Sequence, residues 1–434
     1  MKVFKVKDIQ YHQEGLSRLV GFSIDKPAVN QCFDWPLIEI GGWVVGKDRP
    51  ITEVEFTLQV LNLPLQVAPI NLQREDVERF LPKVKNSKNS GFCNYFSAIG
   101  LPPEFKIFVN AIDCDREVIP MADITIESKG DLKIKTDDLS FFQPILVSAL
   151  PRSGTTWLIQ LLIAHPAIIG YPHYPYELRA AGYWWHACRV LTMPSGLTGL
   201  SHPDLFWFDL QRISGNPSFS IFHGDIIDWF KDTYINRVLL HYKLVIDKFY
   251  KYLAKTYNKS NAIFFIEKQS VPYYSWLAWE LYSKTREIFL VRDWRDVFCS
   301  ILAFNSKRDT MRFGRELVDN DIAFAHRLIQ GISNIHQQFI MRSNCVLLVR
   351  YEDLVLNTSN ELKRILDYIG VDSDSSTIKM VMEQTHLRDP FLEQRRIGRS
   401  AHESIGRWKH DLSPEFQEKI NFVFKDYLQL FGYS

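Results

Sequence analysis

The sequence predicts an α/β protein in which a parallel sheet flanked by helices is preceded by a smaller all-β, sandwich-like domain. Three observations lead to this prediction. A chain of 434 residues exceeds the size of one typical hydrophobic core, so two domains are expected. Its first third alternates polar and apolar residues in short runs. The remainder alternates continuously apolar runs with segments of helical periodicity.

The first domain, residues 1–130, is predicted to consist of short, half-buried strands. Residues 53–60 (EVEFTLQV) alternate polar and apolar side chains, which is the period of a strand with one buried face. Similar strands are expected at 37–45, 106–112 and 122–126, with one short helix at 74–83. Stretches rich in Asn, Ser and Gly separate these elements. The spacing indicates an antiparallel sandwich, and no catalytic constellation is visible in it.

A polar linker, residues 131–142, is expected to lead into the second domain, residues 143–434. Short apolar strands are predicted there at 145–149, 262–266, 288–291 and 346–349. Helices are predicted at 156–164, 294–304, 322–341 and 362–369. Strands that are apolar throughout are typical of a parallel sheet covered on both faces. Ligands bind such folds at the carboxyl ends of the strands.

The first of these strands runs directly into a loop of small residues and then into a helix. The loop and first helical turn hold Arg152, Ser153, Gly154, Thr155, Thr156 and Trp157. Free backbone N–H groups and the helix dipole make such a junction an anion site. Gly154 allows close approach of the backbone, and Arg152 adds a charged donor. The sheet is therefore expected to be of the P-loop type, with this segment as its phosphate loop.

The loop differs from the Walker A pattern GxxxxGK[ST] at two informative positions. Ala149 stands where the first Gly belongs, and Thr155 stands where the Lys belongs. Without that Lys, a site for the β- and γ-phosphates of ATP is impaired. A P-loop kinase or nucleotide triphosphatase is therefore a disfavoured alternative, and a non-catalytic nucleotide-binding protein is a second one.

A second anchor for phosphate is predicted where the strand at 288–291 ends. Arg292 follows that strand, and Ser300 lies eight residues later within the next helix. Both side chains are thus expected at the crevice beside the strand ends. A guanidinium group with a hydroxyl group suits a terminal phosphate.

These two segments together resemble a known family. The string PRSGTTW is similar to the 5′-phosphosulfate-binding loop of sulfotransferases that use 3′-phosphoadenosine 5′-phosphosulfate (PAPS), and the resemblance covers about residues 143–434. It implies PAPS as co-substrate, PAP as product, and a 3′-phosphate held by Arg292 and Ser300. Residues 346–354 (VLLVRYEDL) are similar to the family's strand whose Tyr packs near the adenine, which here is Tyr351. Residues 399–412 resemble the family's loop that folds over the nucleotide, a Gly-hinged loop in which Ser404, Arg407, Trp408 and Lys409 are the candidates.

Sulfuryl transfer needs a base, an aligned acceptor and positive charge near the developing anions. Two residues after the loop helix are candidates for the base, Glu177 and His173. Some branches of the family use a Glu followed two residues later by Arg, which favours Glu177; others use a His. Lys268, just past an apolar strand, is the expected electrophilic helper, together with Arg152. No metal is expected, since no ligand spacing is present.

Composition limits the partners. The net charge of +1 does not favour nucleic acid as a partner, and the six scattered cysteines suit a reducing compartment. The sequence has no uncharged apolar run of 18 residues, so no membrane span and a cytoplasmic location are expected.

Aromatic residues between 171 and 235 could form either an acceptor pocket or a separate core. The acceptor would be a small molecule, glycan or lipid, and the first domain could dock a carrier or partner. The aromatic residues are Tyr183, Trp184, Trp185, Trp207, Phe208, Phe219, Phe222, Trp229 and Phe230.

Overall fold

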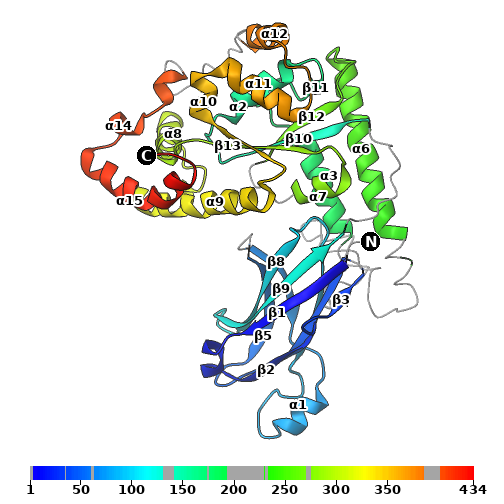
Figure 1. The fold of residues 1–434 in the computed structure, drawn as a ribbon. Coiled ribbons are helices and arrows are strands. Elements are labelled where there is room, and N and C mark those ends of the chain that lie inside the picture. The colour runs from blue at the N-terminus through cyan, green and yellow to red at the C-terminus, as the bar shows by residue number, and fades with distance from the viewer. Residues whose placement is uncertain are drawn as a thin grey trace. The chain divides into compact units, whose positions relative to one another are not determined.

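The structure is a computed structural model that describes residues 3–34, 36–59, 63–130, 141–173, 175–192, 229, 233–269, 275–385 and 401–434. The chain divides into two compact units (Figure 1). The first comprises Met1–Asp137 and Trp184–Lys243, and the second comprises Asp138–Tyr183 and Leu244–Ser434. Helices α3 (Ala180–Leu191) and α6 (Ile235–Thr256) thus contribute residues to both. Among the described residues, no helix is long and apolar enough to cross a membrane.

The first unit contains the predicted β-sandwich. A six-stranded sheet in the order β3-β1-β9-β8-β5-β6 and a three-stranded sheet in the order β2-β4-β7 both pair antiparallel. The strands are β1 (Val3–Tyr11), β2 (Leu19–Lys26), β3 (Cys32–Phe33), β4 (Leu37–Gly46), β5 (Ile51–Leu58), β6 (Leu63–Pro69), β7 (Gly91–Ser97), β8 (Glu104–Asp113) and β9 (Val118–Lys129), with one short helix, α1 (Glu75–Phe80). Each strand predicted in this part of the chain is present. Residue 60 and the linker residues 131–140 lie outside the described residues.

Alternating burial explains why these segments form a sandwich. Phe105, Ile107 and Val109 of β8 are buried, and the residues between them are not. The two sheets meet where Phe56 of one lies 6.3 Å, centroid to centroid, from Phe92 of the other. Gly42 is required by the close pairing of β4 with β2, because a Cβ there would lie 1.9 Å from the Ser23 carbonyl oxygen.

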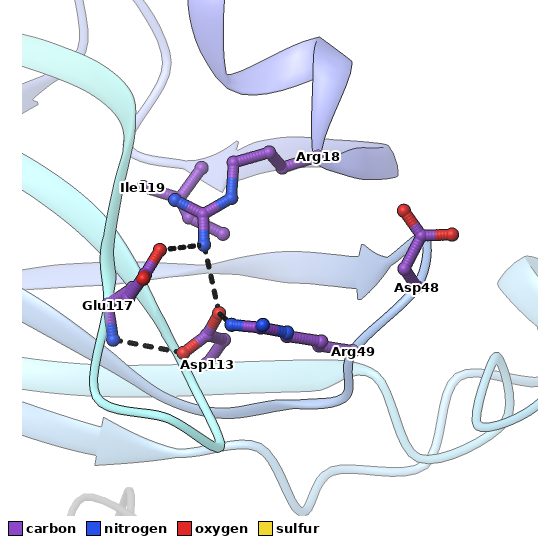
Figure 2. A pocket seen from close by; sticks show the side chains of 6 residues that line it. All are labelled: Arg18, Asp48, Arg49, Asp113, Glu117 and Ile119. Atoms are coloured by element: carbon purple, nitrogen blue, oxygen red, sulfur yellow. Dashed lines mark hydrogen bonds and ion pairs between the residues drawn. The ribbon is translucent and has the colours of Figure 1, made fainter.

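A charged cavity of about 390 Å³ lies beside the β8–β9 turn of this unit (Figure 2). Arg18 Nη2 donates to Asp113 Oδ2 (3.0 Å) and to Glu117 Oε2 (2.6 Å). Asp113 Oδ1 accepts from the backbone N–H groups of Glu117 and Asp115, each at 2.9 Å. These backbone bonds, with the charges of Arg18 and Arg49, hold the pKa of Asp113 below its usual value. The cavity is lined by Arg18, Asp48, Arg49, Asp113, Glu117 and Ile119.

The second unit contains the predicted parallel sheet, with strand order β11-β12-β10-β13-β14. Every pairing in it is parallel. The strands are β10 (Gln143–Ser148), β11 (Ile168–Ile169), β12 (Phe264–Gln269), β13 (Arg286–Val291) and β14 (Leu347–Arg350). Four of the five match predicted strands, and the two-residue edge strand β11 is additional.

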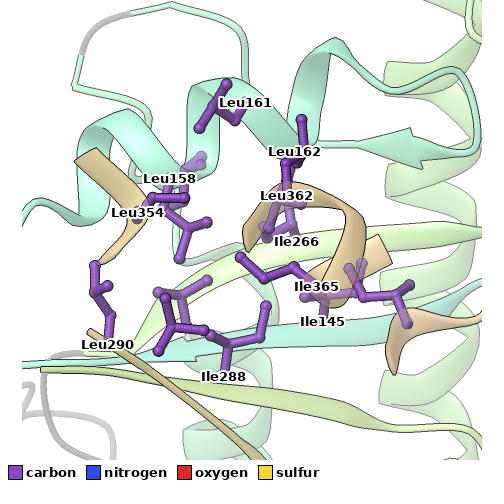
Figure 3. Close-up of a cluster of buried hydrophobic side chains, with 14 of the residues drawn as sticks. Ile145, Leu158, Leu161, Leu162, Ile266, Ile288, Leu290, Leu354, Leu362 and Ile365 are labelled. Atoms are coloured by element: carbon purple, nitrogen blue, oxygen red, sulfur yellow. The ribbon is translucent and has the colours of Figure 1, made fainter. Parts of the chain in front are cut away.

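Helices cover both faces of this sheet. They are α2 (Thr155–Ala164), α7 (Ser275–Leu281), α8 (Trp294–Arg308), α9 (Asp321–Arg342), α10 (Tyr351–Leu356), α11 (Thr358–Ile369), α12 (Ser375–Thr385), α14 (Trp408–Asp411) and α15 (Pro414–Leu430), besides α3 and α6. On β13, Ile288 and Leu290 pack in one core cluster, with α2, α10 and α11 (Figure 3). The intervening Phe289 and Val291 pack in the other, with α8, α9 and α15. Because both faces of the strand are buried, residues 288–291 are apolar on both faces.

One predicted boundary is shifted. The sequence places Tyr351 on a continuing strand, but β14 ends at Arg350 and Tyr351 is the first residue of α10. Arg350 still has extended dihedral angles, and two acidic residues, Glu352 and Asp353, occupy the first turn of the helix. Negative charge near a helix N-terminus is favourable, which explains why the helix begins here.

Candidate active site

Four of the predicted site residues lie at or next to the carboxyl ends of neighbouring strands. Lys268 is the penultimate residue of β12, and Arg292 directly follows β13. The loop with Arg152 follows β10, between those two strands, and Tyr351 follows β14. Because all these strands are parallel, their carboxyl ends share one edge of the sheet. The fold therefore brings together four segments that are far apart in sequence.

The loop between β10 and α2 has an unusual backbone. Arg152 and Gly154 have φ values of 69° and 92°, in the left-handed region, and Gly154 is the N-cap of α2. A Cβ on Gly154 would lie 2.3 Å from Tyr351 Cδ2, so glycine is required here by both conformation and space. The Ser153 hydroxyl is fully buried and has no hydrogen-bond partner among the described residues. A helix N-terminus with free N–H groups favours anions, and an unpaired buried hydroxyl beside it fits the predicted phosphate loop.

Arg152 connects this loop to the helix that carries Ser300. Its Nε donates to Ser300 Oγ (3.2 Å), and its guanidinium group lies 5.0 Å from the ring centroid of Phe304, both on α8. The Arg152 carbonyl accepts from Arg292 Nη1 (3.2 Å). Arg152 of the predicted phosphate loop thus forms one cluster with Arg292 and Ser300, the predicted 3′-phosphate residues.

Arg292 is buried and bound mainly by backbone. Besides the Arg152 carbonyl, its Nη2 donates to the Ser404 carbonyl, and its guanidinium carbon lies 4.7 Å from the ring centroid of Tyr351. Asp296 Oδ2 lies 4.0 Å from Nη2, while Nε has no partner among the described residues. The Arg292 guanidinium group therefore contacts the loop, the C-terminal segment and α10, and its Nε–H is left without a partner among the described residues.

Tyr351 is surrounded by other predicted site residues. Its hydroxyl is 3.0 Å from Ser404 Oγ, and the Trp157 ring meets it edge-on at 6.4 Å. Thr155 is buried, and Thr156 is partly exposed, in the same first turn of α2. The predicted adenine-side tyrosine thus lies against the phosphate loop.

The other candidates in the C-terminal segment point elsewhere. Trp408 is buried in the core cluster with α8, α9 and α15, where the Arg295 guanidinium lies 4.0 Å from its ring. Arg407 is ion-paired with Asp411 (2.5 Å), and Lys409 Nζ is 5.6 Å from the Trp408 ring. The structure brings Ser404 to Tyr351 and Arg292, whereas the contacts of these three side chains with described residues lie elsewhere. The expected first residues of the segment, 399 and 400, lie outside the described residues.

Glu177 and Lys268 form an ion pair. The second oxygen of Glu177 accepts from Arg179 Nη2 (3.1 Å). Burial, with the nearby charges of Arg179 and Arg152, lowers the pKa of Lys268 against the opposing effect of Glu177. Tyr176 and Arg179 on either side of Glu177 have φ values of 60° and 50°. Left-handed non-glycine residues are costly and cluster at functional sites.

His173 lies apart from this ion pair. Its exposed ring packs edge-on against Tyr171 (5.4 Å) and Tyr257 (5.5 Å), centroid to centroid. Among the described residues, its ring contacts are with tyrosines only. The structure therefore groups Glu177, and not His173, with Lys268.

A family model described as "Sulfotransferase family" matches residues 144–375, which is more than half of the chain. This match spans nearly the whole parallel sheet and the segments with Arg152, Glu177, Lys268, Arg292, Ser300 and Tyr351. The chain belongs to the sulfotransferase family.

Solved structures similar to this sulfotransferase include the sulfotransferase domain from the curacin biosynthetic pathway (17% identity; 68% of this chain and 99% of that chain covered; TM-score 0.40). A mouse sulfotransferase complexed with PAP is 13% identical, with 69% and 86% covered and a TM-score of 0.36. A sulfotransferase from Mycobacterium avium is 15% identical, with 68% and 79% covered and a TM-score of 0.36. No curated protein sequence matches the chain. The family assignment depends on the family model.

Two buried acids of this sulfotransferase were missed by the sequence analysis. Glu267, beside Lys268, is fully buried and accepts from the backbone N–H groups of Ala181 (2.8 Å) and Gly182 (3.1 Å) and from the Tyr250 hydroxyl. Burial raises its pKa. Asp296, four residues after Arg292, also binds two backbone N–H groups. The sequence signals that could have indicated them are the position of Glu267 directly before Lys268 and that of Asp296 one helical turn after Arg292.

The aromatic residues that were expected to form either an acceptor pocket or a separate core differ in exposure. Tyr183 on α3 is 70% exposed, whereas Trp185 on the same helix is fully buried. Trp207, Phe208, Phe219, Phe222 and Phe230 lie outside the described residues. Within the described part of the chain, no group of three or more His, Cys, Asp or Glu side chains is arranged to hold a metal ion.

Proposed function

We propose that this sulfotransferase moves a sulfuryl group from PAPS to a hydroxyl or amine of an acceptor by in-line displacement, with release of PAP. The observation that carries the proposal is the convergence of two assemblies at one sheet edge. The first is a phosphate loop with an unpaired, buried Ser153 hydroxyl beside Arg152 and Arg292. The second is the Glu177–Lys268 ion pair, within the electrostatic reach of Arg152. An anion site next to an acid–base pair is what group transfer from an anionic donor requires.

The residues present fit a bound phosphosulfate. Ser153, Gly154, Thr155 and Thr156 would hold it through the hydroxyl and the free N–H groups of the first turn of α2. Arg152 would add positive charge. Arg292 and Ser300 would hold the 3′-phosphate, and Tyr351 and Trp157 would bound the adenosine. When bound, PAPS supplies a sulfuryl group whose bond to phosphate oxygen breaks as the acceptor atom bonds to sulfur.

Glu177 is proposed as the base and Lys268 as the electrophilic helper. The carboxylate takes the proton of the acceptor as its oxygen or nitrogen attacks. Protonation removes the negative charge that holds the Lys268 ammonium group. That group is then available to stabilise the phosphate oxygen that leaves with PAP. The ion pair thus links removal of the acceptor proton to stabilisation of the leaving group.

Calorimetric titration of the full chain with PAP, and separately with ATP and Mg²⁺, tests the nucleotide. We expect PAP to bind without magnesium, and ATP with magnesium to bind far more weakly. Tight ATP binding that needs magnesium, with no PAP binding, would instead support a P-loop kinase. PAP binding with no turnover of PAPS on any hydroxyl or amine acceptor would support a non-catalytic nucleotide-binding protein.

The acceptor is proposed to be a small molecule, a glycan or a lipid, and the first unit is proposed to dock its carrier or a protein partner. The charged cavity of that unit is the candidate docking point, since its Arg18, Arg49 and Asp48 side chains are accessible. Double substitution of Arg18 and Arg49 by Ala tests this proposal. The KM of carrier-bound acceptor should rise while turnover of the free acceptor stays unchanged; equal KM values would exclude docking there.

A further inference from the structure

The covering segment, residues 401–411, is held to α8 in two ways: the Trp408 ring is buried against it, and two backbone N–H groups of the segment bind Asp296. It contains a 3₁₀ turn (His402–Ser404), Gly406 and the short helix α14. Asp296 Oδ2 accepts from the Gly406 N–H (2.7 Å), and Asp296 Oδ1 accepts from the Trp408 N–H (3.1 Å). The Asp296 side chain is fully buried. A single carboxylate therefore binds two N–H groups of this segment with both of its oxygens.

The backbone of the segment is shaped for this contact. Gly406 has a φ of 70°, and no atom lies within 4 Å of the position that a Cβ would occupy there. Glycine is therefore needed for conformation and not for space. The turn directs the N–H groups of residues 406 and 408 at one acceptor, and charge-assisted bonds of this kind are stronger than neutral ones.

The same carboxylate faces the predicted 3′-phosphate arginine. Asp296 Oδ2 lies 4.0 Å from Arg292 Nη2, and that nitrogen donates to the Ser404 carbonyl. Ser404 in turn contacts the Tyr351 hydroxyl. Asp296 and Arg292 thus bind alternate residues of one segment, at positions 404, 406 and 408, so displacement of that segment would remove contacts from both Arg292 and Tyr351.

We propose that Asp296 is a positioning residue that holds the covering segment against Arg292 and so sets how long the nucleotide stays bound. The inference rests on the proposed function for its nucleotide. It assigns to the carboxylate a role in nucleotide retention, without contact between Asp296 and the nucleotide itself.

The charge of Asp296 makes the role measurable. Burial raises its pKa to about 6, although Arg292 and the two N–H groups oppose the shift and Asp293 adds to it. Asp293 is itself paired with Arg295 (2.7 Å), and burial raises the pKa of Cys299 to about 12, so that thiol stays neutral. From the segment, Arg407 pairs with Asp411. As pH falls through about 6, Asp296 becomes neutral and its bonds to residues 406 and 408 weaken.

Protonation of Asp296 weakens its bonds to the covering segment, but it has the opposite effect on the stability of the fold as a whole. A carboxyl group whose folded pKa is raised binds its proton more tightly in the folded state. Between its ordinary value of 3.8 and about 6, acidification therefore stabilises the fold through this group. Asp296→Asn, a neutral variant of the same shape, is accordingly expected to fold. Asp309→Asn at the other end of α8 is the matched control, because Asp309 is an exposed, left-handed C-cap that Asn also tolerates.

Two measurements on the full chain test the proposal. Amide hydrogen exchange of the ligand-free protein at pH 7.5 should be about tenfold faster at residues 406 and 408 in Asp296→Asn than in the wild type or Asp309→Asn. PAP should dissociate from Asp296→Asn about tenfold faster at pH 7.5. The wild type should approach the variant at pH 5.5, after correction for exchange chemistry and for the PAP phosphates.

Unchanged exchange at residues 406 and 408 in Asp296→Asn would overturn the proposal. So would faster exchange with an unchanged PAP dissociation rate, since the segment would then be anchored without consequence for the nucleotide. If the wild type does not bind PAP at all, the proposed function fails. The exchange data then still decide whether Asp296 anchors the segment, and the retention role is rejected with the nucleotide.

Discussion

The proposed active site has two sides, a phosphate side around Arg292 and a base side around Glu177, and they are built in similar ways but bind different partners. On the phosphate side, buried Asp296 binds two N–H groups of the covering segment and lies 4.0 Å from the Arg292 cation. On the base side, buried Glu267 binds two N–H groups at the start of α3 and a neutral Tyr250 hydroxyl. Each acid thus fixes a segment that is distant in sequence and carries or covers site residues. On both sides, a buried carboxylate therefore holds the backbone next to the proposed site residues.

The two sides differ in whether their charged side chains are already paired with each other. On the phosphate side, Arg152 and Arg292 are linked by a hydrogen bond, and the buried hydroxyl of the neighbouring Ser153 has no partner among the described residues. The base side has an internal ion pair, Glu177 with Lys268. Substitutions on the phosphate side should therefore change nucleotide affinity, and those on the base side should change turnover.

Glu177→Gln is expected to produce the largest effect. Loss of the base should lower kcat by about 10²- to 10⁴-fold with little change in PAP affinity. His173→Gln is the matched control, since His173 packs between two tyrosine rings, and its kcat should stay near the wild-type value. Steady-state kinetics with PAPS and calorimetry with PAP give the two quantities. The reverse result, a large loss only in the His173 variant, would transfer the role of base to that residue.

Arg292→Ala should weaken PAP binding by about 10- to 100-fold, the range expected for loss of charge-assisted hydrogen bonds. Arg292 also holds the carbonyls of Arg152 and Ser404, so part of the loss would come from displaced segments. A comparison of PAP with adenosine 5′-phosphate separates these contributions. If Arg292 binds the 3′-phosphate, the variant loses its preference for PAP. An equal loss for both ligands would mean that Arg292 acts only through the loop and the covering segment.

The strands and the phosphate loop could be predicted because their signals are local. Apolar runs mark buried strands, and a small-residue loop between strand and helix marks the anion site. Arg292 and Ser300 could be paired because one strand end and one helix place them. Asp296 and Glu267 could not be found in this way, since their partners come from residues 406–408 and 181–182. The position of Trp408 could not be predicted for the same reason. Its basic neighbours and the family resemblance placed it over the nucleotide, but its ring is buried with α8, α9 and α15.

Glu267→Ala should lower kcat by about tenfold while PAP affinity stays near the wild-type value. The substitution leaves two backbone N–H groups unpaired at the start of α3, a few residues after Glu177, so the ion pair with Lys268 should loosen. Tyr250→Phe removes a single bond to the same carboxylate and should have a smaller effect. Glu267→Gln keeps one acceptor oxygen and should partly restore kcat. A loss of thermal stability in all three variants with no change in kcat would make Glu267 purely structural.

Asp113→Asn, in the cavity of the first unit, should have the smallest effect on the site: none on PAP affinity and none on turnover of a free acceptor. Its effect should be on stability. The folded pKa of Asp113 lies below the ordinary value of 3.8, so its ionised form stabilises the fold above that pH, and this contribution is lost as pH falls through the folded pKa. Urea denaturation should show a less stable variant at pH 7 and a difference that shrinks below pH 3.8. A change in PAP affinity in this variant would mean that the first unit influences the proposed nucleotide site. The first unit could then no longer be assigned to docking alone.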